Sequence, residues 1–291
     1  MSNNASYEIV PFADSSFPIK VAFNRVEAQP ETEPVRNDLF VHWHEHLEIH
    51  WFKQGGARVL SGNEWITTED NDVVVINPSD LHTVLPGSHR SSYWYLIISP
   101  QMLGSDGHDI YGLFWKSLTG EKWRISPVVR RDPAVTTCLA RIVEEYEAAA
   151  PGYELAIRGE LFHLMAQLYR AHRQQLPVSA HKRQDQHLKT ALRLIGERYD
   201  QPLSPQMLAE ACGLNLSYFC RLFRQSTGMT AAAYINAYRL SKASELLTST
   251  DLSVTNIAVR VGFEDVAYFS RCFRRQHGIS PLQYRRQSNN H

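Results

Sequence analysis

The chain has 291 residues, enough for two domains of ordinary size, and its 43% hydrophobic and 21% charged residues are those of a soluble globular protein. Its four cysteines are scattered without a CxxC pair, which excludes a disulfide framework or a zinc knuckle and favours reduced thiols. No signal sequence follows Met1 and no apolar run could span a membrane, so we expect a cytoplasmic protein with no membrane partner.

The formal net charge of zero conceals an asymmetry between the two halves of the chain. Residues 1–179 hold 15 Lys/Arg and 22 Asp/Glu, a net charge of −7, whereas residues 180–291 hold 15 and 8, a net charge of +7. This asymmetry indicates that nucleic acid is a partner of the second half only.

The first hundred residues are predicted to form short β-strands. Runs of apolar and β-branched residues, separated by turn residues, occur at 40–52, 57–60, 64–67, 72–76 and 92–98. Many short strands at this spacing indicate a sandwich or a small barrel.

Histidines are concentrated between residues 42 and 50. If this segment is a strand, its side chains alternate, and one face carries His42, His44, His46, Glu48 and His50. Imidazoles on such a face must lie in solvent, in a polar cavity or on a metal ion.

The spacing H-x-H-x3-E-x6-G, from His42 to Gly55, is similar to the first cupin motif, and residues 72–82 are weakly similar to the second. The cupin resemblance implies a small β-barrel whose metal ligands would be His42, His44, Glu48 and His82. Imidazole and carboxylate suit Fe, Mn, Ni or Zn. Two interpretations stay open: a structural or ligand-contacting role without a cofactor, and a bound divalent metal.

Tryptophans and tyrosines are frequent in the same segment. They suit either a barrel core or a surface on which carbohydrate stacks. We predict a small-molecule pocket with six residues: His42, His44, His46, Glu48, His82 and Trp94.

After residue 132 the apolar residues follow a helical period. Leu139, Ile142 and Val143 share one helical face, and a second helix with the same pattern follows Pro151. This pair either covers the barrel or forms a dimer interface. We therefore divide the chain into a barrel (1–132), a helical pair (133–175), a polar linker (176–186) and a helical domain (187–291).

The helical domain contains an internal repeat. The segment 218–224, YFCRLFR, recurs as 268–274, YFSRCFR, and each copy is followed by a glycine at the same distance, Gly228 and Gly278. An apolar helix with an alanine and a glycine turn precede each copy, which is the layout of a helix-turn-helix. Arginines at matching positions in two copies indicate binding to an extended polyanion at two points.

Each repeat predicts a helix with one core face and one outward face. In the first copy the core face holds Phe219, Leu222 and Phe223. An outward arginine in the DNA major groove can bond guanine bidentately, while arginines further along contact phosphates. The predicted phosphate contacts are Arg224, Arg274 and Arg275.

The second copy continues into the pattern GFEDxxYFSRxFRxxxGxSPxxYR at 262–285. This pattern resembles the signature of the AraC/XylS transcription regulators, over roughly residues 187–287. The resemblance implies two helix-turn-helix units joined by a central helix at 231–247, and an upstream cupin-like domain that binds a small molecule. The base-contacting residues that it implies are Ser217, Cys220, Arg221, Val266, Ala267, Ser270 and Arg271.

The predicted fold is multidomain α+β, with an N-terminal cupin-like β-barrel and two following helices, and a C-terminal all-α domain with two helix-turn-helix units. The expected function is transcription regulation without enzymatic activity. Expected partners are double-stranded DNA, a small-molecule effector such as a carbohydrate, a second copy of the chain and RNA polymerase. Two alternatives remain: a metal-dependent cupin enzyme fused to a DNA-binding domain, and a ligand-independent DNA-binding protein whose barrel only dimerises.

Overall fold

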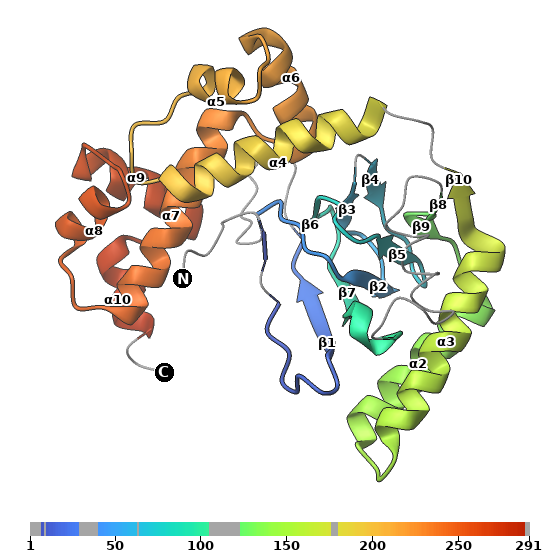
Figure 1. Ribbon diagram of the computed structural model, residues 1–291. Helices are drawn as coiled ribbons and strands as arrows, with labels where there is room; N and C mark the ends of the chain where they lie inside the picture. Colours follow the sequence, from blue (N-terminus) through green and yellow to red (C-terminus); the bar gives the residue numbers. More distant parts are fainter. Residues whose placement is uncertain are drawn as a thin grey trace. The chain divides into compact units, whose positions relative to one another are not determined.

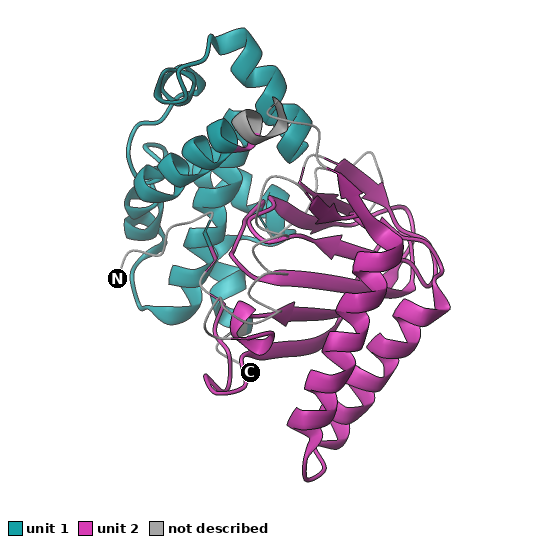
Figure 2. Ribbon diagram, turned by 45° about the vertical axis from the view of Figure 1, so that its right-hand side comes forward, with its two compact units in different colours: residues 1–7, 36–40, 186–291 teal, residues 8–35, 41–185 magenta. Residues whose placement is uncertain are grey.

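A computed structural model describes residues 7–8, 10–28, 40–62, 64–104, 123–175 and 180–288. They belong to two compact units, coloured separately in Figure 2. The N-terminal unit holds residues 8–35 and 41–185, and the helical unit holds residues 186–291 together with residues 1–7 and 36–40. Among the residues described, no helix is long and apolar enough to cross a membrane.

The larger sheet of the N-terminal unit has five antiparallel strands in the order β1-β7-β2-β5-β9 (Figure 1). Their bounds are β1 Ile19–Val26, β7 Ser91–Ile98, β2 Leu47–Gln54, β5 Val73–Ile76 and β9 Val128–Val129. The strand predicted at 40–52 differs, because β2 begins only at Leu47. Before it, the backbone of His42 leaves this sheet and pairs with that of His82 in an isolated bridge.

The smaller sheet has three strands in the order β4-β3-β6. Their bounds are β4 Glu64–Thr67, β3 Arg58–Ser61 and β6 His82–Leu85. A hydrophobic cluster with residues from both sheets fills the space between them, including Phe52 and Tyr93 from the larger sheet and Val59 and Val84 from the smaller.

The expected N-terminal β-sheet domain is confirmed, but its cupin-like barrel is not closed, and two sheets pack on each other. Within the described ranges, the hydrogen-bonded strands form separate sheets, and the His42–His82 bridge joins only the segment before β2 to β6. Side-chain packing, and not a continuous hydrogen-bonded ladder, holds the two sheets together.

Two antiparallel helices, α2 (Pro133–Ala148) and α3 (Tyr153–His172), cover one face of the larger sheet (Figure 1). Their apolar stripes share a core with the strands, and this core includes Ile49, Leu96, Leu139 and Leu164. Asp132 begins α2 by accepting a hydrogen bond from the Ala134 amide. The short strands β8 (Trp123–Ile125) and β10 (Arg173–Gln175) pair with each other beyond the ends of this hairpin.

The helical unit consists of seven helices among the described residues. They are α4 Ala180–Arg198, α5 Pro205–Ala211, α6 Leu216–Thr227, α7 Ala231–Ser249, α8 Val254–Arg260, α9 Val266–His277 and α10 Pro281–Ser288. The pairs α5–α6 and α8–α9 are helix-turn-helix units, and α7 joins them, so the predicted all-α C-terminal fold is confirmed. Helix α4 begins at residue 180, inside the stretch expected to be a linker.

The two copies are built from matching local signals. Serine caps α5 and α8, and a short polar side chain, Asn215 or Asp265, accepts a hydrogen bond from the third amide of α6 or α9. Both second helices end at a glycine with a left-handed backbone, Gly228 and Gly278. The sequence repeat is therefore a structural repeat.

One residue distinguishes the two turns. Gly213 lies two residues before the cap Asn215, whereas Gly262 lies three residues before the cap Asp265, because Glu264 is an additional residue. The repeat period is accordingly 49 residues before this point and 50 residues after it.

Candidate functional site

The second helix of the first copy, α6, has one buried and one exposed face. Phe219, Leu222 and Phe223 are buried, as predicted. The predicted DNA contacts on this helix are all exposed: Ser217, Cys220, Arg221 and Arg224. The outward face of α6 is thus available to a partner.

Helix α9 repeats this arrangement with one difference. The side chains of Ala267, Arg271, Arg274 and Arg275 are exposed, and Ser270 is half-buried. Val266 instead packs against the core of the second copy. Less of the Val266 side chain is therefore available to contact a DNA base than the sequence pattern predicts.

A tyrosine ring lies beside the equivalent arginine in each copy. The Arg221 guanidinium carbon is 5.5 Å from the centroid of the Tyr218 ring, and that of Arg271 is 5.9 Å from the centroid of the Tyr268 ring. Contacts of this kind attract a cation to the ring face. They favour the same side-chain direction for both arginines, one turn into each helix.

Each second helix is fixed on its core side by aromatic contacts of the same kind. Phe223 meets Tyr234 of α7 edge to face at a centroid distance of 5.4 Å, and Phe273 meets Tyr284 of α10 in the same way at 5.4 Å. The exposed faces of α6 and α9 are therefore carried by rigid, repeated cores.

Two arginines that the sequence did not distinguish have structural roles. Arg239 of α7 donates to the carbonyls of Tyr199 and Gln201, in the turn after α4. Arg285 of α10 donates to the carbonyls of Leu247 and Leu252, around the end of α7. These bonds connect residues 33 to 40 positions apart, so no local sequence signal could have identified them.

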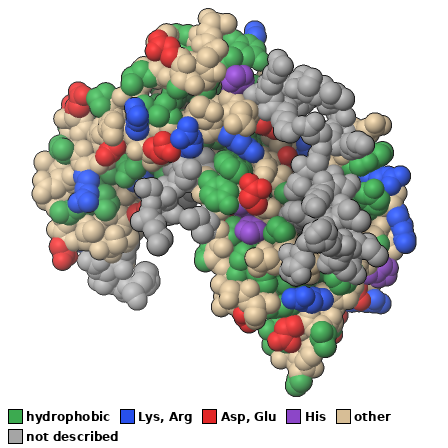
Figure 3. Space-filling model, in the orientation of Figure 1, with side chains coloured by type: hydrophobic (Ala, Val, Ile, Leu, Met, Phe, Trp, Pro, Cys, Tyr) green, Lys and Arg blue, Asp and Glu red, His purple; other side chains and the backbone are tan. Residues whose placement is uncertain are grey.

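Basic side chains do not form a continuous patch on the face of the protein shown in Figure 3. On the face shown in Figure 3, Lys and Arg side chains alternate with acidic ones. Helices α6 and α9 supply exposed arginines at matching positions.

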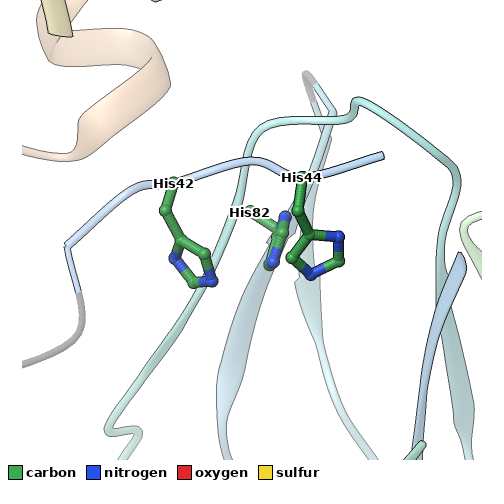
Figure 4. Close-up of side chains that lie close together, drawn as sticks. All are labelled: His42, His44 and His82. Carbon is green, nitrogen blue, oxygen red and sulfur yellow. The ribbon is translucent and has the colours of Figure 1, made fainter. Parts of the chain in front are cut away.

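The histidine cluster, defined as His42, His44, Glu48 and His82, lies in the N-terminal unit. His42 and His44 hang from one segment, and His82 lies between and behind them on β6 (Figure 4). The ring centroids of His42 and His82 are 4.1 Å apart, and those of His44 and His82 are 4.8 Å apart. His44, Glu48 and His82 are at most 6% exposed.

The Glu48 carboxylate contacts three imidazoles. Its oxygens lie 2.9 Å from Nε2 of His44, 3.1 Å from Nε2 of His82 and 2.6 Å from Nε2 of His50. Burial alone would raise the pKa of Glu48, but His50 and the hydrogen bonds from the imidazoles hold this pKa well below its ordinary value. Glu48 is thus a buried carboxylate in the ionised form.

His82 is held as one neutral tautomer. Its Nδ1 lies 2.9 Å from the carbonyl oxygen of Asp80, which can only accept, so Nδ1 carries the hydrogen. Burial, together with the neighbouring His42, lowers the pKa of His82 to about 4. The Nε2 atom is buried and lies 3.1 Å from a Glu48 oxygen.

The structure separates some of the residues predicted to line one pocket. His46 lies next to the cluster, with its ring 5.4 Å from that of His44 and in edge contact with Phe12. Trp94 does not lie there. It pairs with Trp51 across the strands, on the sheet face that α2 and α3 cover, whereas Glu48 points to the opposite face.

Three residues near the cluster were not among the predicted site residues. A carboxylate oxygen of Glu8 lies 2.9 Å from Nε2 of His42, and a carboxylate oxygen of Glu48 lies 2.6 Å from Nε2 of His50. The Tyr93 ring lies 5.0 Å from the His50 ring, and its hydroxyl accepts from the Asn24 amide. The alternation along the strand already placed His50 on this face, but nothing in the sequence pointed to Glu8 or Tyr93.

The donor atoms of the cluster suit a divalent metal ion. One ligand nitrogen from each of His42, His44 and His82 lies within 4.8 Å of the others. Two nitrogens on a tetrahedral zinc ion are separated by about 3.3 Å, given bonds of about 2.0 Å, so small side-chain rotations would suffice. Nε2 of His82 lies 3.1 Å from the Glu48 carboxylate, so the three imidazoles and this carboxylate have the ligand types that fit such an ion.

Comparisons with known proteins match parts of both units. Residues 34–165 match the AraC-like ligand binding domain, and residues 208–287 match a helix-turn-helix domain. The HTH-type transcriptional activator RhaS of Escherichia fergusonii is 28% identical over 247 residues, which cover 84% of this chain and 86% of that protein. The arabinose operon regulatory protein of Salmonella typhimurium is 24% identical over 236 residues, covering 79% and 80%.

Among solved structures, that of ToxT from Vibrio cholerae O395 aligns with 94% of this chain and 99% of its own, at 13% identity and a TM-score of 0.40. The curated relatives named above are a transcriptional activator and an operon regulator, which supports a regulator over an enzyme.

Proposed function

Because the chain belongs to the AraC family of transcription regulators, we propose that a small molecule bound by residues 1–132 controls how residues 187–291 bind DNA. The observation that carries this proposal is the pair of exposed arginine-bearing helices, α6 and α9, built from repeated caps and cores. Selection of fragments from the source genome by the purified chain tests it. Recovery of no enriched sequence would contradict sequence-specific binding.

The proposed DNA interface divides the exposed residues between two roles. We assign base contacts to the first two turns of α6 and α9, with Arg221 and Arg271 as the principal residues. We assign phosphate contacts to Arg224, Arg274 and Arg275, which lie further along the helices. The smaller base-contacting side chains are Ser217, Cys220, Ala267, Ser270 and, with less exposed surface, Val266.

Replacing Arg224 or Arg274 by alanine is expected to weaken binding to all DNA sequences alike. Each change removes one phosphate contact, so the slope of log K against log salt becomes smaller by about one. Fluorescence anisotropy at several salt concentrations measures this slope. Arg193→Ala is the matched control, since Arg193 is an arginine of α4 that pairs with Glu197, and its removal should leave the slope unchanged.

We propose that the effector is a sugar or a related carbon metabolite. The arabinose operon regulatory protein is a relative over most of the chain, and the buried polar cluster beside Tyr93 and His50 offers donors and acceptors for hydroxyl groups. The proposed contacts are the residues that lie together: His42, His44, His46, Glu48 and His82.

A fragment of residues 180–291 is expected to bind DNA but not to respond to the effector. The helical unit has its own buried core around α7, and the proposed effector site lies wholly in the other unit. DNA affinity of the full chain and of the fragment is measured with and without each member of a sugar panel. An effector response retained by the fragment would contradict the placement of the site.

Effector binding itself can be followed without DNA. All six tryptophans lie between residues 43 and 123, so their fluorescence reports on the N-terminal unit. A ligand at about 100 times its Kd should stabilise that unit by about 2.7 kcal/mol and raise its melting temperature. A complete panel without any shift would favour the ligand-independent alternative.

We further propose that the chain acts in the cytoplasm as a homodimer and contacts RNA polymerase. Residues 133–175 are the proposed dimer interface, since α3 presents Leu155 with 77% of its surface exposed. Light scattering of the full chain gives its molar mass, and a monomer at cellular concentrations would contradict the dimer.

A further inference from the structure

We propose that the α2–α3 hairpin binds one zinc ion through Cys138, Glu160 and His163, a group of residues called the hairpin site below. None of the three belongs to the histidine cluster or to the arginine-bearing faces of α6 and α9. The inference therefore goes beyond the regulatory function proposed above and does not depend on it. It rests on donor atoms that converge between two packed helices.

The hairpin brings one donor from α2 to two donors on α3. Glu160 and His163 are three residues apart on α3, so their side chains are neighbours on one helical face. Pairs of the form Glu-x-x-His hold metal ions where helices face each other in bundles. Cys138 comes from α2, the antiparallel helix of the hairpin (Figure 1). One ligand atom from each of the three residues lies within 4.8 Å of the others.

Two neighbouring side chains orient the polar donors of the hairpin site. Nη1 of Arg141 lies 3.1 Å from Oε1 of Glu160. The other carboxylate oxygen, Oε2, is buried and has no nitrogen or oxygen donor among the described residues. The side-chain nitrogen of Gln167 lies 3.0 Å from Nε2 of His163 and so holds this ring in place. Carboxylates and imidazoles that bind metals are commonly held by outer partners of this kind.

The charges of Cys138 and Glu160 suit a divalent cation. Cys138 is 2% exposed and 20% of the Glu160 side chain is accessible, so a thiolate beside this carboxylate would place two negative charges where little water reaches. A divalent ion offsets both charges. The proton of the Cys138 thiol leaves to solvent as the sulfur–zinc bond forms. His163 is exposed and gives the ion a route from solvent.

Zinc is the ion that this set of donors fits. It binds sulfur at about 2.3 Å and nitrogen or oxygen at about 2.0–2.2 Å in a tetrahedron, so its ligand atoms are about 3.3–3.6 Å apart. Side-chain rotations would bring the donors of the hairpin site from within 4.8 Å to this separation. Calcium and magnesium prefer oxygen ligands and do not match a thiolate and an imidazole. Three protein ligands leave the fourth position to a water molecule.

The test uses the full chain, reduced and dialysed against a chelator, and titrates it with Co²⁺ as a spectroscopic substitute for zinc. A thiolate ligand gives Co²⁺ an intense near-ultraviolet charge-transfer absorption that nitrogen and oxygen ligands do not give. We expect this absorption to saturate at one ion per chain and to disappear when Zn²⁺ is added. Because the histidine cluster contains no cysteine, Co²⁺ bound there would not contribute to the signal.

Cys138→Ser should abolish the thiolate absorption, and His163→Gln should lower the affinity for Co²⁺ by at least about 10-fold. His163 is exposed, so its replacement leaves the core of the hairpin intact even if Cys138→Ser disturbs it. Cys220→Ser is the matched control, because Cys220 is the exposed one of the four cysteines and lies in the helical unit. It should bind Co²⁺ as the parent does. No thiolate absorption in the parent, its persistence in Cys138→Ser, or equal affinities of His163→Gln and the parent would overturn the proposal.

Thermal melting followed by tryptophan fluorescence provides a second readout and shows whether each variant keeps its N-terminal unit folded. Zn²⁺ should raise the melting temperature of this unit in the parent and in Cys220→Ser, because it binds the folded hairpin. The rise should be smaller in Cys138→Ser and in His163→Gln. An equal rise in all four proteins would place the ion elsewhere and overturn the proposal. Neither measurement involves DNA or an effector, so failure of this inference is distinguishable from failure of the regulatory function.

Discussion

Gly262→Ala is expected to destabilise the helical unit by about 2–4 kcal/mol, through backbone strain and a steric clash. Gly262 has a φ of +86°, which L side chains rarely adopt. An added Cβ would also lie 2.9 Å from the carbonyl oxygens of Tyr199 and Asp200. These are backbone atoms, and they cannot rotate away as the end of a side chain could.

The repeat supplies a matched control for this change. Gly213 occupies the equivalent turn with a φ of +66°, but nothing lies within 4 Å of the position its Cβ would take. Gly213→Ala should therefore cost only the strain of a left-handed alanine, about 1 kcal/mol. The difference between the unfolding free energies of the two variants therefore measures the steric clash separately from the backbone strain.

Circular dichroism of the helical signal, recorded in urea for a fragment of residues 180–291, measures both free energies of unfolding. In the full chain, tryptophan fluorescence provides an internal check, because all six tryptophans lie outside the helical unit and their transition should not move. Equal destabilisation by Gly213→Ala and Gly262→Ala would contradict the close contact at residues 199–200.

The close approach of Gly262 to residues 199 and 200 is also expected to affect DNA binding. Arg239 holds the turn at residues 199–201 on α7 through two carbonyls, and its guanidinium lies 5.9 Å from the Phe263 ring centroid. The second helix-turn-helix thus packs, through Gly262, against the turn that connects α4 to α5, the first helix of the other unit. We infer that this joint fixes the distance between α6 and α9, so Gly262→Ala should weaken binding to DNA more than Gly213→Ala does.

The helix-turn-helix units could be predicted from sequence because their signals are local. Each cap, glycine turn and core face lies within a dozen residues, and the repeat displays each signal twice. The joint could not be predicted, since Arg239 acts on residues 38 and 40 positions away. Helix α4 was expected to start later because its first two turns, AHKRQDQ, are polar and have no apolar stripe.

In the N-terminal unit, the alternation of side chains along a strand predicts only part of the histidine cluster. The face shared by Glu48 and His50 follows the predicted alternation, because these residues lie within β2. His42 and His44 precede the strand, and they join the cluster through the backbone bridge to His82. Trp94 lies on the other face of the sheet from the cluster, because its position depends on the register between β2 and β7, which the sequence does not display.

Arg221→Ala and Arg271→Ala are each expected to lower affinity for the cognate site by roughly 1–3 kcal/mol and to relax specificity at one base pair. Both side chains are exposed, one turn into α6 and α9, and each lies beside a tyrosine ring. Binding to a panel of single-base variants of the cognate site measures the effect. The affinity for unrelated DNA should change much less.

Lysine replacements separate base contact from charge. Arg221→Lys and Arg271→Lys keep the positive charge but lose the paired donors that match guanine, so they should retain non-specific affinity and still lose discrimination. If the lysine variants recover full specificity, these arginines contact phosphates only, and the division of roles proposed for α6 and α9 is wrong.

Arg221→Ala and Arg271→Ala should lose discrimination at different base pairs, because the two helix-turn-helix copies differ in their other outward residues. Cys220 of α6 corresponds to Ser270 of α9, and the capping residue is neutral Asn215 in one copy and charged Asp265 in the other. One helical unit would then bind an asymmetric site in a single orientation. Discrimination lost at the same base by Arg221→Ala and Arg271→Ala would instead require two equivalent half-sites.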